Sequence, residues 1–386
     1  MKQIVCLATS PWHPIPTRKQ QVMSRLQDFE ILYFDPSISY LAPMKDPAAK
    51  EKLRAYQGPE EVVQPGLTVC ALPPVLPFFN KYRFINRLNQ RRMARFVRKK
   101  MKAHGFEKPI LWVYSPVCAD LVDHVPHSAL VYDCVDRHSA YGGLMNPALV
   151  DQMELELAAK CDQVFATAKP LAERLEAANP HTAFIPNGAN FARFYEASKP
   201  LPCPEELRDI PHPLFGFVGA LQPCIEYGFL EYAAKTHPEW HFVFLGGEKP
   251  GADLSKLKAM ANCHFLGLRP NEQLPAYIAQ FDACLNLFAA GDLSKDVSPL
   301  KFYEYLATGK PIVSTPQPEQ VLQFKDLIHI APTAEDFVRC CREALLEHDT
   351  DLREGRLEAG RRSSWDARVA QMREILTRRG IFPEGT

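Results

Sequence analysis

A helix followed by a buried strand is predicted by one stretch of the sequence, Ser298-Pro299-Leu300-Lys301-Phe302-Tyr303-Glu304-Tyr305-Leu306-Ala307-Thr308-Gly309-Lys310-Pro311-Ile312-Val313-Ser314. Ser298 can cap the helix, and Pro299 suits its first position. Gly309 suits the left-handed residue that follows a helix end, and the apolar run after it suits a buried strand. The stretch therefore predicts one helix-to-strand unit of an α/β sheet.

Two charged residues at the start of this helix suggest a ligand. Lys301 and Glu304 are three residues apart, so they share one helical face near the N-terminus. Unpaired backbone N–H groups at that end suit a phosphate, and Lys301 adds a full positive charge beside them. Because Glu304 can accept hydrogen bonds from a ribose diol, the pair describes a pocket for a nucleoside diphosphate. A solvated helix start that binds nothing is the alternative that this segment alone leaves open.

Composition indicates a two-domain globular protein. The chain has 386 residues, of which 46% are hydrophobic and 23% charged, and it contains no run of about 18 apolar residues. The apolar run at the N-terminus is too short for a signal peptide and is predicted to be a first strand. The eleven cysteines lie mostly in apolar runs and form no CxxC pair, so we expect reduced thiols and a cytoplasmic protein.

Positive charge is concentrated in the first half of the chain. Residues 1–190 carry 23 Lys or Arg and 18 Asp or Glu, whereas residues 191–386 carry 22 and 27. The helical segment 80–102 is basic and is interspersed with apolar residues, which is typical of a helix on an anionic membrane surface. A solvated helix face is the other interpretation. Nucleic acid is not an expected partner, because no nucleic-acid motif accompanies these charges.

Short apolar runs alternate with helical segments along the whole chain. Strands are predicted at residues 4–8, 31–34, 67–72, 110–114, 130–132, 164–166, 183–185, 214–218, 241–245, 263–266 and 283–287. This alternation predicts an α/β fold of two doubly wound, Rossmann-like domains facing a cleft. We place the domains at 1–198 and 199–364, because a Pro-rich passage lies at their junction, and we expect helix 365–386 to cross back to the first domain. No GxGxxG follows the first strand, which argues against a dinucleotide-dependent oxidoreductase.

Several ordered motifs resemble those of the GT-B glycosyltransferases, in particular the group 1, or family 4-like, enzymes of bacterial polysaccharide and teichuronic acid biosynthesis. The similar segments are Tyr132-Asp133-Cys134-Val135-Asp136, Ile185-Pro186-Asn187-Gly188-Ala189-Asn190, Phe217-Val218-Gly219-Ala220-Leu221, Phe265-Leu266-Gly267 and Ser298 to Pro311. They span nearly the whole chain in the order found in that family. The resemblance implies transfer of a sugar from a nucleotide diphosphate sugar to an acceptor held in the cleft between the two domains.

The resemblance also implies roles for individual residues of the C-terminal, donor-binding domain. Glu304 would bind the ribose, and the diphosphate would be surrounded by Ser298, the Leu300 backbone and Lys301. At two earlier strand ends, Gly219 would approach the phosphates and Leu268 would lie near the nucleobase. Positive groups would then stabilise the departing nucleoside diphosphate. No DxD motif is placed to bind a divalent ion, so neither a metal nor a cofactor is expected besides the nucleotide sugar.

Two departures from the family pattern affect the sugar end of this site. Asp296 stands where the retaining enzymes commonly have a first glutamate, and Ala220-Leu221-Gln222-Pro223 replaces an arginine-containing turn. Whether the reaction retains or inverts the anomeric configuration therefore stays open. So do the nucleobase, the sugar, the acceptor, the linkage and the oligomeric state.

Candidate catalytic residues follow two strands of the N-terminal domain. They are Asp136 and His138, after the strand that ends at Tyr132, and His13, after the first strand. Each could act as a base on the acceptor hydroxyl, and each could equally be structural. We expect Asp133 to be structural, and Arg18 to be a solvated helix start unless it meets an acceptor phosphate.

The predicted function is a glycosyltransferase, of hexosyltransferase type, that acts on a glycan or polyprenyl-linked acceptor in cell-envelope or exopolysaccharide assembly. Its predicted location is the cytoplasm, with peripheral contact at the inner face of the cell membrane left open. Two alternatives also remain open. One is a nucleotide-sugar 2-epimerase, which would need no acceptor, and the other is a non-catalytic nucleotide-sugar-binding partner of another transferase.

Overall fold

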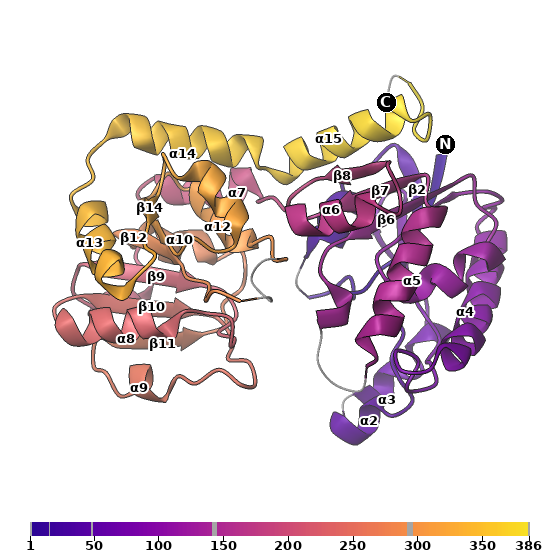
Figure 1. Cartoon of the computed structure of the whole chain (residues 1–386), viewed down its shortest axis with the longest axis horizontal. Coiled ribbons are helices and arrows are strands. Elements are labelled where there is room, and N and C mark those ends of the chain that lie inside the picture. Colours follow the sequence, from indigo (N-terminus) through magenta and orange to yellow (C-terminus); the bar gives the residue numbers. More distant parts are fainter. Residues whose placement is uncertain (1, 15, 48, 141–144, 292–295, 385–386) are drawn as a thin grey trace. The chain divides into compact units, whose positions relative to one another are not determined.

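The computed structural model describes residues 2–14, 16–47, 49–140, 145–291 and 296–384. The chain forms two compact units, one of residues 1–185 and 369–386 and the other of residues 186–368 (Figure 1). Both units are built from a mainly parallel sheet with helices, as the alternating sequence pattern predicts. Within the described ranges, no helix is both long and apolar enough to cross a bilayer.

Unit 1 has an eight-stranded sheet in the order β3-β4-β2-β1-β5-β6-β7-β8. Only the β3–β4 pair is antiparallel among these strands, whose residues are described. The strands are β1 (Lys2–Leu7), β2 (Phe29–Asp35), β3 (Glu61–Gln64), β4 (Leu67–Ala71), β5 (Ile110–Val113), β6 (Ala129–Cys134), β7 (Gln163–Ala166) and β8 (Thr182–Phe184). The helices are α1 (Arg18–Met23), α2 (Ala42–Lys45), α3 (Ala49–Lys52), α4 (Arg83–Ala103), α5 (Pro147–Lys160) and α6 (Lys169–Glu176).

Both faces of this sheet are covered. Successive residues of a strand point to opposite faces, and along β1 Val5 and Leu7 pack in one hydrophobic cluster while Ile4 and Cys6 pack in another. The first cluster includes residues of α4 and α5, and the second includes residues of α1 and of the C-terminal segment. Burial on both faces explains why the strands appear in the sequence as continuous apolar runs.

Unit 2 has a six-stranded parallel sheet in the order β11-β10-β9-β12-β13-β14. The strands are β9 (Leu214–Val218), β10 (His241–Leu245), β11 (Cys263–Gly267), β12 (Ala283–Asn286), β13 (Ile312–Ser314) and β14 (His329–Ile330). The helices are α7 (Phe191–Tyr195), α8 (Tyr227–Thr236), α9 (Ser255–Lys258), α10 (Leu274–Ala279), α12 (Leu300–Leu306), α13 (Ala334–Leu345), α14 (Thr350–Arg362) and α15 (Trp365–Arg378), the last of which continues into unit 1.

Each sheet contains a point where the chain reverses its direction of winding. In unit 1, β1 lies between β2 and β5, and in unit 2, β9 lies between β10 and β12. The strands that follow β1 or β9 in the chain are first added on one side of that strand. The chain then crosses over, and β5 or β12 pairs with its other side. The carboxyl ends of strands at such a point form a crevice, which is where open α/β sheets bind ligands. Both units therefore present a binding edge.

The units divide at residues 185 and 186, and not at the Pro-rich passage near residue 199 where the sequence placed the junction. Residues before that passage already pack within unit 2. Phe194 of α7 is fully buried in its core, and the Asn187 backbone N–H donates to the Ser298 hydroxyl at 3.0 Å. The second crossing lies between Arg368 and Val369, inside α15, so residues 369–386 belong to unit 1.

Candidate functional site

The segment that leads into α12 is held by hydrogen bonds to Asn187. Besides the Asn187 N–H bond to the Ser298 hydroxyl, Asn187 Nδ2 donates to the Ser298 carbonyl at 2.9 Å. The helix begins at Leu300 with Pro299 in the cap position, and Ser298 makes no cap. The prediction that Ser298 caps this helix is therefore wrong, because its hydroxyl is engaged by a residue 111 positions away in the sequence. Gly309 has the predicted left-handed conformation, with φ of 72°.

Lys301 and Glu304 form the predicted pair on one face of α12. Lys301 Nζ lies 2.8 Å from Glu304 Oε2, and Glu304 is only 8% exposed. Burial raises the pKa of the Glu304 carboxyl, an effect that the Lys301 charge opposes. Glu304 Oε2 faces the Lys301 ammonium, and within the described part of the chain it has no hydrogen-bond partner beyond that lysine. A buried carboxylate oxygen in this state is suited to accept a hydrogen bond from a ligand.

Gly219 lies beside Lys301 at the reversal point of the unit 2 sheet. It follows β9 with φ of 150°, and its N–H donates to the Leu245 carbonyl at 2.8 Å. A Cβ added to Gly219 would lie 3.8 Å from Lys301 Cγ, so this turn and the first turn of α12 are adjacent. The Tyr305 hydroxyl secures the arrangement by accepting the Val218 N–H at 2.7 Å. Gly219, Lys301 and Glu304 thus lie close together, and their roles in donor binding stay a prediction.

The predicted nucleobase contact is two strands away from this group. Leu268 follows β11, which β10 separates from β9, and its side chain is 67% exposed. The three strand ends are connected, because the Gly246 N–H after β10 donates to the Gly267 carbonyl at 2.9 Å. The structure therefore places Leu268 on the same edge of the sheet as Gly219.

In unit 1, Tyr114 after β5 and the residues Asp136 and His138 after β6 lie near Lys19 of α1. His138 Nε2 lies 3.1 Å from the Tyr114 carbonyl oxygen, and burial lowers the pKa of His138 while the charges of Glu154 and Asp136 oppose this. Lys19 is 8% exposed, and its ammonium lies 5.7 Å from the Tyr114 ring centroid. Burial lowers the pKa of Lys19, and the nearby Asp136 charge raises it. Lys19 was not predicted, because its position at a helix start resembled any solvated lysine.

His13 occupies a different environment. Its side chain is 64% exposed, and its Nε2 lies 3.1 Å from Glu61 Oε1 on β3. An exposed histidine with a surface carboxylate is the arrangement expected of a structural contact. The proposed catalytic role of His13 stays a prediction, as do those of Asp136 and His138.

Arg18 is buried, contrary to the expectation of a solvated helix start. It is 2% exposed, and its Nε donates to both carboxylate oxygens of Asp133, at 3.0 and 2.9 Å. Its Nη1 donates to the Ile185 carbonyl at 3.0 Å. The ion pair with Asp133 joins the start of α1 to β6, and the bond to Ile185 joins it to the residue after which the chain enters unit 2. Asp133 therefore has the structural role that was expected of it. Among the described residues, no group of three His, Cys, Asp or Glu could hold a metal ion.

Comparison with known proteins finds glycosyltransferases. Residues 212–347 match the family of the "Glycosyl transferases group 1". Across 292 residues the chain is 24% identical to a protein described as a teichuronic acid biosynthesis glycosyltransferase, TuaH of Bacillus subtilis (strain 168), covering 71% of this chain and 72% of TuaH. These matches indicate a glycosyltransferase, and the match to the group 1 family lies in residues 212–347.

Solved structures show that this glycosyltransferase has the GT-B fold. The sucrose-phosphate synthase of Thermosynechococcus elongatus superposes with a TM-score of 0.69 at 14% identity, over 98% of this chain and 99% of that one. HepE from Anabaena, in complex with UDP-glucose, superposes with a TM-score of 0.65 at 14% identity, over 98% and 100% of the two chains. The family match in this glycosyltransferase covers Gly219 and Leu268, which follow β9 and β11, and the helix α12 that carries Lys301 and Glu304.

Proposed function

We propose that this glycosyltransferase moves a sugar from a nucleotide diphosphate sugar to a glycan or lipid-linked glycan acceptor in cell-envelope or exopolysaccharide assembly. One observation carries the donor half of the proposal. Glu304 is buried, its Oε2 lies 2.8 Å from the ammonium of Lys301 at the reversal point of the sheet, and that oxygen has no further hydrogen-bond partner in the described chain. The TuaH relative and the HepE complex with UDP-glucose support the acceptor and donor classes.

Lys301, Glu304 and Gly219 have only to bind the donor and stabilise the charge of its leaving group. When the bond to the sugar breaks, negative charge develops on the leaving diphosphate, and Lys301 stabilises it. Glu304 accepts hydrogen bonds from the two ribose hydroxyls, which fixes the nucleotide relative to Lys301. Gly219 has no side chain, so a phosphate can approach its backbone closely. Asp136 and His138 are the candidate groups for removing the proton from the acceptor hydroxyl.

The donor site is tested by binding and turnover with a panel of UDP-, GDP- and ADP-sugars. We expect one nucleotide series to bind and release nucleotide, with Lys301→Met or Glu304→Gln weakening binding about 10- to 100-fold, because each removes a charge-assisted hydrogen bond. Lys325→Met, which removes an exposed lysine of the same unit, is the matched control. Sugar isomerisation without transfer would support the epimerase alternative. Unchanged binding in both variants would refute the site.

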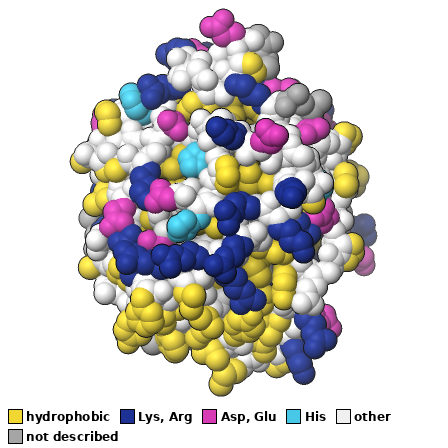
Figure 2. All heavy atoms as spheres, turned by 90° about the vertical axis from the view of Figure 1, so that its right-hand side faces the viewer, with side chains coloured by type: hydrophobic (Ala, Val, Ile, Leu, Met, Phe, Trp, Pro, Cys, Tyr) yellow, Lys and Arg dark blue, Asp and Glu magenta, His cyan; other side chains and the backbone are white. Residues whose placement is uncertain are grey.

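The acceptor is proposed to be lipid-linked because one surface of unit 1 suits an anionic membrane. Figure 2 shows apolar side chains gathered at the lower edge of this face, with Lys and Arg in a band above them. The exposed apolar residues of this surface come from α2 and the two residues before it, from the segment before α4 and from the first turns of α4, and are Tyr40, Leu41, Met44, Leu76, Phe78, Tyr82, Phe84 and Leu88. Hydrogen bonds from the Tyr40 N–H to the Val75 carbonyl and from Arg92 to the Tyr40 hydroxyl hold these segments together.

Membrane contact is tested by flotation with liposomes. Phe84 is 71% exposed and Leu88 is 58% exposed, and α4 carries nine Lys or Arg and no acidic residue. We expect the protein to float with vesicles containing anionic lipid at low salt and to stay unbound with neutral vesicles. The double variant Phe84→Ser/Leu88→Ser should reduce flotation strongly, whereas Leu346→Ser, at a 76% exposed position in unit 2, should leave it unchanged. Failure of the unmodified protein to float would remove the membrane part of the proposal.

A further inference from the structure

A cavity of about 170 Å³ lies between α4 and the carboxyl edge of the unit 1 sheet. Its walls come from residues that end or follow β1, β2, β4 and β5 and from residues of α4. Leu7, Leu72, Val75, Met93 and Leu121 make the lining largely apolar, and none of the described residues that line it is charged. A charged group placed there would lose its hydration without gaining a partner, so the cavity suits an uncharged, apolar group.

The size of the cavity corresponds to a short piece of hydrocarbon chain. An engineered cavity of about 150 Å³ in another protein holds benzene, so this space takes about six carbons. A longer chain would place its end in the cavity and the rest of its length outside.

The cavity adjoins the exposed apolar residues around the start of α4. Val75 lines it, and the next residue, Leu76, is 39% exposed. In α4, Asn89 lines it, and the preceding residue, Leu88, is exposed. The amide of Asn89 joins the two segments, because its Oδ1 accepts the Leu76 N–H at 2.9 Å and its Nδ2 donates to the Leu76 carbonyl at 3.0 Å. The same two segments thus form a wall of the cavity and part of the apolar surface.

Phe78, which precedes the lining residue Phe79, has a strained backbone. Its φ of 63° lies in the left-handed region, which is unfavourable for an aromatic residue. The N–H groups of Lys81 and Tyr82 both donate to the Phe78 carbonyl at 3.0 Å, and Phe78 is left 39% exposed. Strain of this kind concentrates at ligand-binding sites, so the exposed Phe78 points to a ligand at this side of the cavity.

Positive charge lies beside the same wall. The Tyr40 N–H donates to the Val75 carbonyl at 3.1 Å, and Arg92 of α4 donates to the Tyr40 hydroxyl at 2.9 Å. α4 carries nine Lys or Arg and no acidic residue, and Figure 2 shows Lys and Arg adjoining the apolar side chains on this face. An apolar surface bordered by cations is complementary to a lipid with an anionic headgroup.

We propose that this cavity takes the terminal carbons of one acyl chain of an anionic phospholipid. The proposal rests on the proposed function, since it needs the membrane contact assigned to this surface. The rest of the chain lies on the exposed apolar residues, and the headgroup meets the cations of α4. Moving a chain end from the bilayer between apolar walls costs little, because those walls gain the packing contacts of a filled space.

Soluble lipids test the cavity without a membrane or a donor, so this result is independent of flotation and of nucleotide binding. Protein labelled with ¹³C at the methionine methyl groups is titrated with dihexanoyl and dibutanoyl phosphatidylglycerol below their micellar concentrations. The Met93 signal, assigned with Met93→Leu, reports the cavity, and that of Met372, buried in the other cluster of unit 1, reports unrelated changes. We expect the dihexanoyl lipid to shift Met93 alone, saturably, and to bind about 10- to 20-fold more tightly than the dibutanoyl lipid, because two more methylenes enter the cavity.

The headgroup and the kind of chain are tested with the same signals. Dihexanoyl phosphatidylcholine should bind more weakly than dihexanoyl phosphatidylglycerol, because it carries no net charge. Nanodiscs of phosphatidylglycerol should move the Met93 signal toward the position reached with the dihexanoyl lipid, and nanodiscs of phosphatidylcholine should not. Equal binding of the two headgroups would overturn the anionic assignment. Tighter binding of geranyl phosphate than of the dihexanoyl lipid would show a prenyl chain and overturn the assignment to an acyl chain.

The variant Val75→Phe places an aromatic ring in the cavity. It should weaken binding of the dihexanoyl lipid about tenfold or more, because the ring takes the space of the chain. Val62→Phe makes the same chemical change at a 71% exposed position of β3 and should leave binding unchanged. Absence of a Met93 shift with the dihexanoyl lipid, or equal binding by a folded Val75→Phe protein, would overturn the proposal. The titrations of the unmodified protein decide it even if that variant fails to fold.

Discussion

At Glu304, the ionised carboxylate that suits ligand binding lowers the stability of the fold. Its carboxylate is buried, and burial raises its pKa above the ordinary value despite the neighbouring Lys301. A carboxyl whose pKa is higher in the folded state stabilises the fold only while it is protonated. Its contribution is therefore present below the unfolded-state pKa and is lost as the pH rises through the folded-state pKa. At neutral pH the ionised Glu304 should cost stability, which a bound ribose would offset by supplying hydrogen bonds.

We therefore expect Glu304→Gln to be more stable than the unmodified protein at pH 8, by on the order of 1 kcal/mol. The difference should shrink toward pH 5 and vanish below the unfolded-state pKa, where the carboxyl is neutral in both states. Urea unfolding of the nucleotide-free proteins at several pH values measures this. The same substitution should weaken nucleotide binding, so stability and function would move in opposite directions. A variant that is less stable at pH 8 would contradict the argument.

The residues that sequence analysis found contact partners close in the sequence, whereas those it missed contact partners far away in the sequence. Lys301 and Glu304 were predictable because a spacing of three residues on a helix determines their proximity. Arg18 was not, because its partner Asp133 is 115 positions away and only the folded sheet brings them together. The same holds for Lys19, whose surroundings come from α1, β5 and β6. Local pattern cannot report a contact that depends on strand order.

At the edge of the unit 2 sheet, the close approach of two turns explains why residue 246 is a glycine. The turn after β9 and the turn after β10 pack so tightly that a Cβ on Gly246 would lie 1.8 Å from the Gly219 carbonyl oxygen. Both atoms in that clash would be attached to backbone, so no side-chain rotation relieves it. The next residue, Gly247, has open space around it, with no atom within 4 Å of a Cβ placed there.

This contrast predicts different outcomes for two adjacent substitutions. Gly246→Ala should lower the free energy of unfolding by about 2 kcal/mol or more, because the backbone of one turn has to move. It should also weaken nucleotide binding, since the displaced turn carries Gly219. Gly247→Ala should change stability by less than about 0.5 kcal/mol. Thermal unfolding and nucleotide titration of both variants check this, and equal behaviour of the two would show that the turns are not rigidly packed.

At the level of elements, most parallel strands were predictable, whereas the edge strands β3 and β14 were not. Strands buried on both faces appear as apolar runs, so β5 and β9 fell within the ranges expected from the sequence and β1, at Lys2–Leu7, overlaps the expected range 4–8. β3 was missed, because its residues Glu61–Gln64 are half-buried or exposed and pair only with β4. An antiparallel edge strand of this kind has no distinctive pattern.

The domain junctions were the least predictable feature of the whole chain. A Pro-rich passage suggests a linker, but residues 186–198 before it already pack on unit 2 through Asn187 and Phe194. Composition could not reveal this, because the decisive contacts are with α12 and with a core assembled from distant strands. From the sequence we also expect helix 365–386 to cross back to the first domain, and residues 369–386 belong to unit 1.

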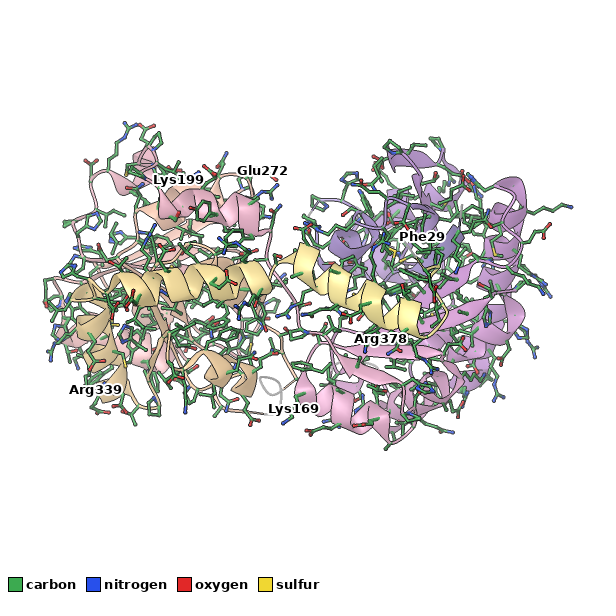
Figure 3. The ribbon with its side chains drawn as sticks, turned by 90° about the horizontal axis from the view of Figure 1, so that it is seen from above. Phe29, Lys169, Lys199, Glu272, Arg339 and Arg378 are labelled. Carbon is green, nitrogen blue, oxygen red and sulfur yellow. The ribbon has the colours of Figure 1, made fainter. Side chains whose placement is uncertain are left out.

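The C-terminal segment is an integral part of the core of unit 1. Five of its apolar side chains are buried there, namely those of Val369, Met372, Leu376, Ile381 and Phe382. The Phe382 and Phe29 ring centroids are 4.5 Å apart, and Figure 3 looks onto α15 with Phe29 and Arg378 labelled. Burial of a large apolar side chain contributes about 1.5–3 kcal/mol. Five of them together approach the whole stability of an ordinary domain, which is about 5–15 kcal/mol.

A chain that ends at Arg368 should consequently fail to fold unit 1 while unit 2 keeps its core and its donor site. Calorimetry should show one thermal transition in place of the full-length profile, and the nucleotide that binds the intact protein should still raise the temperature of that transition. A chain that ends at Pro383 keeps all five buried residues and should unfold like the intact protein. If the chain ending at Arg368 retains the complete profile, residues 369–386 are only an appendage, and the core of unit 1 is complete without them.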